Sequence, residues 1–300
     1  MLTDTYDHLE DPAHRIIDEV IKEALAKSKH DRRKVLLIDV GGYFAEPVLR
    51  LQEAKEDLNL LAGIVEDTTF GHNRYLATVS KLNVPVFSVA RSPLKEIEAR
   101  FVGRDAVIAA DAVLRNIGVM LSGRHALVLG YGMIGSNVAR SLRANDLDVE
   151  AYIDGFNIFP KRLIIGRADI IFSAAAAQSL SYSEIEECKD GVVLASVGSK
   201  ESEFDVRSVK EQALSQHKLS DHLVEYRLSN SRAIRVIKDG TALNFILPSL
   251  PVEILDLIFS EIFLSMMLIV RRPQEYPPGH LHTVRGAFGY HFVGMAAARE

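Results

Sequence analysis

The chain has 300 residues, of which 48% are hydrophobic, and a formal net charge of −5. This length fits one large domain or two ordinary ones, and the negative charge without a long basic run argues against a nucleic-acid binder. Cys188 is the only cysteine, which excludes an intrachain disulfide and a cysteine metal cluster and fits a reducing cytoplasm. The N-terminus does not resemble a signal peptide. We expect no membrane span, because Asp256 and Glu261 interrupt the longest apolar run.

Strands and helices alternate over the first 120 residues. Asp11 and Pro12 form a typical helix start, and an amphipathic pattern follows to about Leu25. We then expect strands at 34–39, 61–65 and 84–89, and helices at 45–56, 73–82, from Pro93 onward and over 104–120. Such alternation indicates a parallel sheet with helices on both faces.

A glycine-rich turn follows the next apolar strand, 125–129. Gly130, Gly132 and Gly135 form a G-x-G-x-x-G pattern, and a helix from Ile134 to about Arg143 is expected to follow. The first glycine allows a tight turn, the second lets the backbone approach a pyrophosphate, and the third lets the helix pack closely on the strand. The N–H groups at the start of that helix are free to bind the phosphates. The turn therefore predicts a dinucleotide site.

Asp154 is expected at the end of the following strand, 149–154. A carboxylate at this point accepts hydrogen bonds from an adenosine ribose and repels a 2′-phosphate, so it favours NAD over NADP. Further strands are expected at 168–172, 191–196 and 232–237. The fold class is therefore α/β, with two Rossmann-like, doubly wound parallel-sheet domains. We assign 121–249 to the NAD-binding domain, and 1–120 with 250–300 to a substrate or catalytic domain.

The last fifty residues begin with an apolar helix at 250–272. Glu253, Asp256 and Ser260 form a solvated stripe on it, so we interpret it as a core or subunit-interface helix. The segment 277–282 reads as a loop. Its histidines, His280 and His282, have no obvious third partner, so we predict no metal site.

Several segments together resemble the S-adenosylhomocysteine hydrolases. They are the cofactor strand at 122–132, the run 63–69 followed by Gly71, Lys95 followed eight residues later by Gly103, and the run 240–244. The resemblance extends over about 34–270. It implies a tightly held NAD that transiently oxidises a ribose hydroxyl, with the protein supplying acid–base groups and orientation.

The resemblance carries over well for the cofactor half. It places Thr68, Thr69 and Asn244 near the nicotinamide, and it places the phosphates at the glycine turn. The cofactor-binding residues that we predict are Thr68, Thr69, Gly130, Gly132, Met133, Ile134, Gly135, Asp154, Gly198 and Asn244.

The substrate half departs from the family pattern. Val40 stands where the family has a substrate-contacting acid, Ala99 where it has the aspartate partner of the lysine, and Ser199 where it has a histidine. The family's N-terminal segment, with its adenine-binding motifs, is not recognised in this sequence. We therefore do not expect ordinary hydrolysis of S-adenosylhomocysteine.

Three residues are candidate catalytic groups. Lys95, which matches the family's active-site lysine, could act as a base or lower the pKa of a substrate hydroxyl; its alternative is a solvated lysine on a helix. His72 is a candidate acid or base, with a capping or surface histidine as the alternative. Asp67 could orient Lys95 or a substrate hydroxyl, or it could cap the next helix. Glu203 and Asp205 are expected to face solvent or cap a helix, and Cys188 to be an ordinary helix residue.

Three functional hypotheses remain open. The first is an enzyme that uses NAD, bound in the cleft between its domains, to oxidise a hydroxyl of a nucleoside-like or other small substrate, either as a net redox reaction or within a redox-neutral elimination. The second is a non-catalytic NAD-binding regulatory or complex subunit. The third is a protein whose missing substrate portion comes from a partner chain. In each case we expect a cytoplasmic homo-oligomer that binds no nucleic acid.

Overall fold

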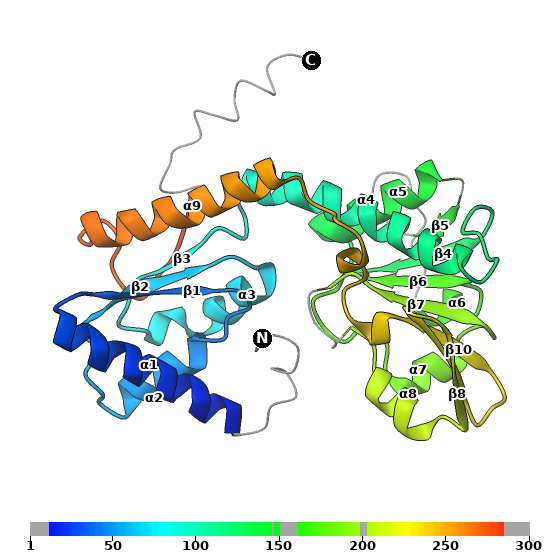
Figure 1. Ribbon diagram of the computed structural model, residues 1–300, viewed down its shortest axis with the longest axis horizontal. Coiled ribbons are helices and arrows are strands. Elements are labelled where there is room, and N and C mark those ends of the chain that lie inside the picture. The colour runs from blue at the N-terminus through cyan, green and yellow to red at the C-terminus, as the bar shows by residue number, and fades with distance from the viewer. Residues whose placement is uncertain (1–11, 146, 151–160, 199–202, 285–300) are drawn as a thin grey trace, which may run out of the picture. The chain divides into compact units, whose positions relative to one another are not determined.

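The structure is a computed structural model that describes residues 12–145, 147–150, 161–198 and 203–284. It divides into two compact units, one formed by residues 1–97 with 251–300 and the other by residues 98–250. Both are α/β, as the strand–helix alternation predicts (Figure 1).

Unit 1 contains a four-stranded parallel sheet with the order β1-β2-β3-β11. Its strands are β1 (Val35–Asp39), β2 (Leu61–Glu66), β3 (Val86–Ser88) and β11 (Leu281–Thr283). Its helices are α1 (Pro12–Asp31), α2 (Ala45–Glu53), α3 (Thr69–Thr78), the short 3-10 helix η2 (Val79–Lys81) and α9 (Val252–Arg271). The last fifty residues thus return to the first sheet, and β11 lies where the sequence indicated a loop.

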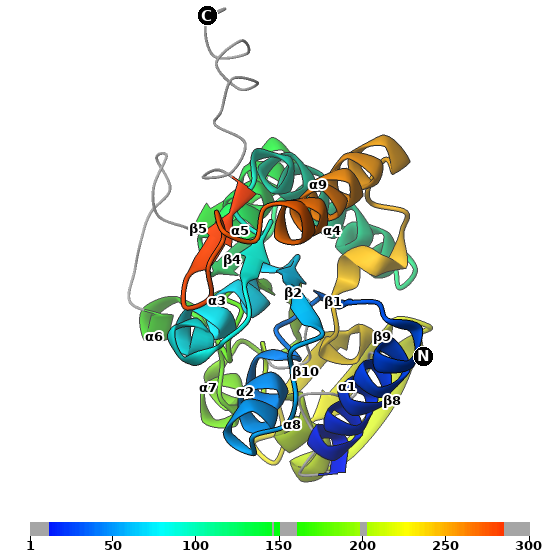
Figure 2. The ribbon, with the colours of Figure 1, turned by 90° about the vertical axis from the view of Figure 1, so that its left-hand side faces the viewer.

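Alternate side chains of β2 and β3 face opposite sides of the unit 1 sheet, as the pleat requires. Ile64 and Val86 pack with α1, α2 and α3, whereas Val65 and Phe87 pack with Ile258 and other residues of α9. Figures 1 and 2 show α9 on one side of the sheet and α1 with α2 on the other. The predicted solvated stripe of α9 is confirmed, since Glu253, Asp256 and Ser260 are exposed.

Unit 2 contains a seven-stranded sheet with the order β5-β4-β6-β7-β10-β9-β8. The strands are β4 (His125–Leu129), β5 (Asp148–Glu150), β6 (Ile170–Ser173), β7 (Val192–Ser196), β8 (Ser215–Ser220), β9 (Leu223–Arg227) and β10 (Ala233–Ile237). Its helices are α4 (Pro93–Arg115), which starts in unit 1, α5 (Met133–Ala144), α6 (Lys161–Ile164), α7 (Tyr182–Glu187), α8 (Val206–Gln212), η3 (Lys238–Gly240) and η4 (Leu243–Ile246). The strands β5, β4, β6, β7 and β10 are parallel, and the hairpin β8–β9 adds an antiparallel edge.

The boundary between the units differs from the expected one near residue 120. A single helix, α4, replaces the two expected at 93 and at 104–120, and its later turns bury Ala106, Ala110 and Val113 against Ala126 of β4 and Phe172 of β6. This packing places residues 98–120 with unit 2, because their apolar face covers the second sheet rather than the first. On the other face of that sheet, Ile171 and Leu194 pack with residues of α7 and α8.

None of the helices in the described ranges is long and apolar enough to cross a membrane.

Candidate functional site

The glycine turn in unit 2 has the geometry of a phosphate-binding loop. It joins β4 to α5, and the strand order places the turn beside the switch point between β4 and β6, where open α/β sheets bind ligands. Gly130 has a φ of +85°, and a Cβ on it would lie 2.6 Å from the carbonyl oxygen of Ala174. A Cβ on Gly135 would overlap with the carbonyl oxygen of Gly130. Both positions therefore require glycine.

Gly132 differs from these two glycines because a Cβ on it would meet no atom of the described residues within 4 Å. Its backbone is extended, with a φ of −79°, and it caps α5 without a side-chain hydrogen bond to the first turn. The space in front of Gly132 and the N–H groups of Met133 and Ile134 thus fit an incoming pyrophosphate. Asp154, the predicted ribose ligand, lies outside the described residues.

Glu203 holds the loop that follows β6, next to the glycine turn. Its side chain is buried and accepts hydrogen bonds from Ser173 Oγ at 2.5 Å and from the N–H groups of Ala175 and Ala176 at 3.0 Å each. Burial raises the pKa of Glu203, while these three donors lower it. The expectation that Glu203 faces solvent or caps a helix is wrong, because the carboxylate satisfies the backbone of this loop instead.

The position of Glu203 also explains why residue 198, a predicted cofactor-binding residue, is a glycine. A Cβ on Gly198 would overlap with Oε1 of Glu203, so glycine lets the end of β7 approach this carboxylate. Asp205 caps α8 by accepting from the N–H of Ser208 at 3.1 Å. Asn244 is buried in η4. Cys188 lies at the C-terminal cap of α7, where burial raises its thiol pKa to about 12.

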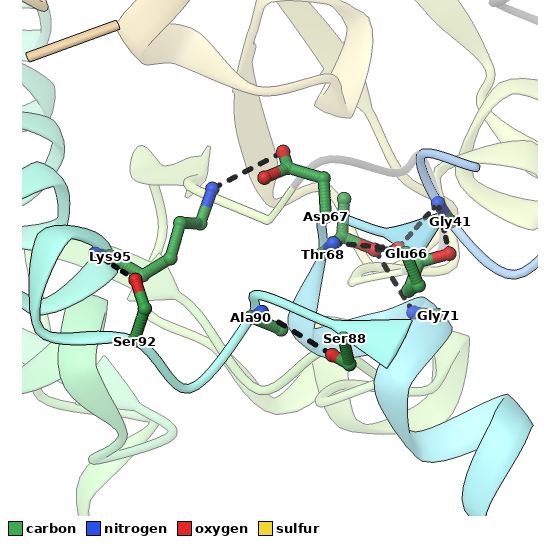
Figure 3. Close-up of polar contacts among 9 residues, drawn as sticks. All are labelled: Gly41, Glu66, Asp67, Thr68, Gly71, Ser88, Ala90, Ser92 and Lys95. Atoms are coloured by element: carbon green, nitrogen blue, oxygen red, sulfur yellow. Dashed lines mark hydrogen bonds and ion pairs between the residues drawn. The ribbon is translucent and has the colours of Figure 1, made fainter. Parts of the chain in front are cut away.

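In unit 1 the polar residues gather where parallel strands end. Asp39, Glu66 and Ser88 are the last residues of β1, β2 and β3, and all three side chains are buried. The carboxyl ends of parallel strands meet at one edge of a sheet, which is where α/β proteins place their ligand sites. Figure 3 shows Glu66 and Ser88 at this edge.

Glu66 is surrounded by hydrogen-bond donors. Its carboxylate accepts from the N–H of Gly42 at 2.8 Å, from the N–H of Thr68 at 2.6 Å and from the Thr68 hydroxyl at 2.7 Å. Burial and the nearby charge of Asp39 raise the pKa of Glu66 to about 7, against the effect of these donors. The carboxylate therefore fixes the two loops that follow β1 and β2.

Asp39 anchors the same edge from β1. It accepts from the Tyr75 hydroxyl at 2.6 Å and from the N–H groups of Tyr43 and Phe44. Burial raises the pKa of Asp39, and it raises the pKa of Tyr75 well above its usual value. The carboxylates of Asp39 and Glu66 thus hold the loops after β1 and β2 in place and are not free to bind a ligand.

Lys95 and Asp67 form an ion pair in this unit. Lys95 Nζ lies 3.3 Å from Asp67 Oδ2, and the side chains are only 11% and 19% exposed (Figure 3). The alternative of a solvated lysine is therefore wrong. Asp67 does not cap α3, because Thr68 does so by accepting from the N–H of Gly71 at 3.0 Å. Asp67 Oδ1 is buried and has no hydrogen-bond partner within the described part of the chain.

His72 is buried on the first turns of α3. Its Nδ1 lies 2.9 Å from Ser88 Oγ, and burial together with the charge of Arg91 lowers its pKa. A neutral imidazole with one fixed nitrogen results.

The described residues contain no group of three His, Cys, Asp or Glu side chains that could hold a metal ion. The His282 ring contacts Phe87 in a tilted arrangement and Tyr276 edge-to-face, and its Nε2 lies 2.8 Å from the carbonyl oxygen of Pro277.

Comparison with known proteins identifies the family. Adenosylhomocysteinase from Thermotoga maritima is 30% identical over 283 residues, which cover 89% of this chain and 69% of that protein. The chain belongs to the S-adenosylhomocysteine hydrolase family. Residues 100–248 match the model of the NAD-binding domain of S-adenosyl-L-homocysteine hydrolase, so both the resemblance and the prediction of NAD are confirmed.

Two further comparisons give lower sequence identities. S-inosyl-L-homocysteine hydrolase from Methanopyrus kandleri is 28% identical over 81% of this chain and 61% of its own length. The chain thus spans about three fifths to two thirds of these relatives. The solved pyruvate reductase of Chlamydomonas reinhardtii is 18% identical over 60% of this chain and 59% of its own, with a TM-score of 0.44, which is too low to indicate more than a general likeness.

Proposed function

We propose that this protein is an enzyme that uses NAD to oxidise a hydroxyl group of a nucleoside-like or other small substrate. The observation that carries the proposal is the largely buried Lys95–Asp67 ion pair, in which Asp67 Oδ1 has no hydrogen-bond partner among the described residues. The other unit of the chain holds the glycine turn. A largely buried lysine that is paired with a carboxylate is typical of a residue that transfers a proton in an active site.

Oxidation of an alcohol releases a hydride from carbon and a proton from oxygen. NAD, when bound, supplies the acceptor for the hydride. Lys95 acts on the proton: as a free amine it accepts the proton from the hydroxyl, and as an ammonium it stabilises the developing oxyanion. Asp67 holds the lysine nitrogen in place, and its unpaired Oδ1 can accept a hydrogen bond from the substrate.

Two positions support a substrate other than S-adenosylhomocysteine. Val40 follows β1 at the carboxyl edge and is 58% exposed, and Ala99 is buried on α4 one turn after Lys95. Neither side chain can donate or accept a hydrogen bond, whereas the resemblance places carboxylates at both positions. Ser199, the third departure from the family pattern, lies outside the described residues.

Lys95→Ala tests the role of the lysine. We would incubate the protein and its variant with NAD and with adenosine, inosine or S-adenosylhomocysteine, and follow cofactor reduction near 340 nm. We expect reduction with at least one hydroxylated compound for the wild type, and a loss of about 10²–10⁴-fold in rate for Lys95→Ala with NAD affinity retained. Full activity of the variant would contradict the assignment. Rapid release of homocysteine from S-adenosylhomocysteine by the wild type would contradict the proposal of a different substrate.

A second candidate is a non-catalytic NAD-binding subunit. The apolar side chains of Val40 and Ala99 favour it, since they remove acid–base groups without replacing them. Tight binding of NAD with no reduction by any hydroxylated compound, alone or with a co-encoded partner chain, would select this alternative.

A further inference from the structure

His72 and Ser88 form a buried hydrogen-bonded pair at the carboxyl edge of the unit 1 sheet. His72 lies on the first turns of α3, and Ser88 is the last residue of β3. The two residues are 8% and 1% exposed, and His72 Nδ1 lies 2.9 Å from Ser88 Oγ. The main-chain N–H of His72 donates to the carbonyl oxygen of Thr68 at 2.9 Å, so the backbone and the ring of His72 are both held in place.

The hydrogen bonds of Ser88 determine which nitrogen of His72 carries the proton. Ser88 Oγ accepts from the N–H of Ala90 at 3.3 Å (Figure 3), and its only other partner among the described residues is His72. If Nδ1 donated a proton to Ser88, the hydroxyl hydrogen of Ser88 would be buried without an acceptor. The hydroxyl therefore donates to Nδ1, and in the neutral ring the proton lies on Nε2.

The surroundings of His72 favour the uncharged ring. Burial lowers the pKa of His72, and so does the charge of Arg91. A charged ring would also carry a proton on Nδ1, and the Ser88 hydroxyl would then have to turn its hydrogen into a buried place without an acceptor. The hydrogen bond from Ser88 and the burial thus act in the same direction.

Nε2 is the open end of the ring. It makes no hydrogen bond among the described residues, and it is not one of their fully enclosed unpartnered polar atoms, so part of its surface is accessible. A donor whose direction is already fixed loses little freedom when it binds a ligand. Asp67, on the same side of β2, supplies the complementary group, because its Oδ1 is an acceptor without a donor in the described part of the chain.

We infer that His72 is a substrate-binding residue whose Nε2–H, fixed by Ser88, donates to an uncharged oxygen of a substrate with several hydroxyl groups, such as a ribose ring. The inference rests on the proposed function and names the class of its substrate. A hydroxyl group both donates and accepts hydrogen bonds, so such a compound can satisfy the acceptor Asp67 Oδ1 and the donor His72 Nε2–H. In this role His72 keeps its proton, in contrast to a general acid or base.

Nuclear magnetic resonance of the full chain with isotope-labelled histidine nitrogens tests the tautomer without NAD or substrate. His72→Gln identifies the His72 signals by their loss. We expect a protonated Nε2 and an unprotonated Nδ1 at neutral pH in the wild type, and a mixture of the two tautomers in Ser88→Ala. Ser80→Ala removes an exposed hydroxyl from η2 and should leave the His72 signals unchanged.

Two results of this experiment would overturn the inference. The first is a proton on Nδ1 of the wild type, alone or together with one on Nε2. The second is a folded Ser88→Ala protein with the wild-type tautomer, since Ser88 would then not fix the ring. If Ser88→Ala does not fold, as judged by its melting temperature, Ser88→Cys replaces it, because a thiol is only a weak donor.

Calorimetric titration with adenosine and with inosine tests the ligand. His72→Gln keeps the donor and acceptor pattern of the neutral tautomer, because its amide oxygen can accept from Ser88 while its amide nitrogen donates to the ligand. His72→Phe keeps a ring without either group. We expect His72→Phe to bind the nucleoside about three- to tenfold more weakly than the wild type, and His72→Gln to recover most of the affinity.

Three outcomes of the titration would contradict this assignment. They are unchanged affinity in a folded His72→Phe protein, an equal loss in His72→Phe and His72→Gln, and no binding of either nucleoside by the folded wild type. The second outcome would mean that the shape of the ring matters and its N–H does not.

These outcomes are distinguishable from failure of the proposed function, which is measured as reduction of NAD and its loss in Lys95→Ala. If no compound reduces NAD while the tautomer and the nucleoside affinities are as expected, the oxidation proposal fails and the assignment of His72 stands. If a hydroxylated compound reduces NAD in a manner that depends on Lys95, but neither nucleoside binding nor the tautomer is as expected, only the inference about His72 fails.

Discussion

Gly132 and Gly135 serve different purposes in the same turn. Gly135→Ala would force a Cβ into the carbonyl oxygen of Gly130 and should destabilise unit 2 by several kcal/mol, because the contact is with backbone. Gly132→Ala places its Cβ in open space on an ordinary backbone, so we expect the free energy of unfolding to change by less than about 1 kcal/mol. The same Cβ should weaken NAD binding at least about tenfold, because it occupies the space that the pyrophosphate needs.

Calorimetric titration with NAD, together with urea unfolding, separates these two effects. Gly166→Ala is the matched control in unit 2, because its Cβ would lie 3.5 Å from the carbonyl oxygen of Glu187 in an ordinary contact. It should leave both stability and affinity near wild type. A Gly132→Ala variant that binds NAD as well as the control would contradict the assignment of the phosphate position.

Glu66 gives the protein a specific pH dependence. Its pKa in the folded chain is about 7, above the value of 4.5 expected for the unfolded chain. The folded state therefore binds more protons between these values, and the contribution of Glu66 to stability is lost as pH rises through this window. The whole shift corresponds to roughly 3 kcal/mol.

Glu66→Gln removes this titration and provides the reference. We expect the free energy of unfolding of the wild type, relative to Glu66→Gln, to fall by about 2–3 kcal/mol between pH 5 and pH 8. The difference between the two proteins matters, since His72 has a lowered pKa and contributes a slope of the opposite sign. Parallel pH profiles for the two proteins would contradict the raised pKa.

At the scale of single residues, the sequence predicts which side chains are candidates for the site better than it predicts which of them are buried. Lys95 and Asp67 stand out because the family pattern places them, and the structure brings them together. Glu203 was not predicted as a site residue, because a glutamate in a polar loop is usually solvated. The signal that could have found Glu203 is Gly198, whose missing side chain makes room for the carboxylate.

At the scale of structural elements, the conformation of the loop after β6 depends on Glu203. Glu203→Ala would remove an acceptor from the buried Ser173 hydroxyl and from the N–H groups of the exposed residues Ala175 and Ala176, at a cost of roughly 1–3 kcal/mol. Because Ala174 and Ala175 pack on Gly130, we expect this variant also to weaken NAD binding. Glu203→Gln, which keeps one acceptor oxygen, should lose less of both.

Glu211→Ala is the control for this element, since Glu211 is exposed on α8, where it pairs with Arg207. Urea unfolding and NAD titration of the three variants check the prediction. A Glu203→Ala protein as stable as Glu211→Ala would show that the carboxylate does not support the loop.

The strands and helices divide into those with local signals and those without. The strands that carry the two sites, β1 to β4, are apolar runs, and the sequence predicts them. The hairpin β8–β9 and the short strand β11 were not predicted. Residues 215–218 of β8 are all exposed, and β11 forms only by pairing with β3, so neither has an apolar pattern of its own.

At the scale of the whole molecule, the two α/β units and the return of the C-terminal helix to unit 1 follow from the sequence. The exact boundary does not, because α4 belongs to both units and its assignment depends on which sheet its apolar face covers. The predicted homo-oligomer stays a prediction. Phe259 and Phe263, each more than half exposed on α9, are the residues with which we would test it.

The most direct test of the account is a calorimetric titration of the full chain with NAD after removal of any cofactor carried through purification. We predict saturable binding of one NAD per chain, lost or weakened at least about tenfold in Gly132→Ala and unchanged in Gly166→Ala. No saturable binding to the folded wild-type protein, or equal binding by all three proteins, would contradict the claim that this glycine turn holds the dinucleotide.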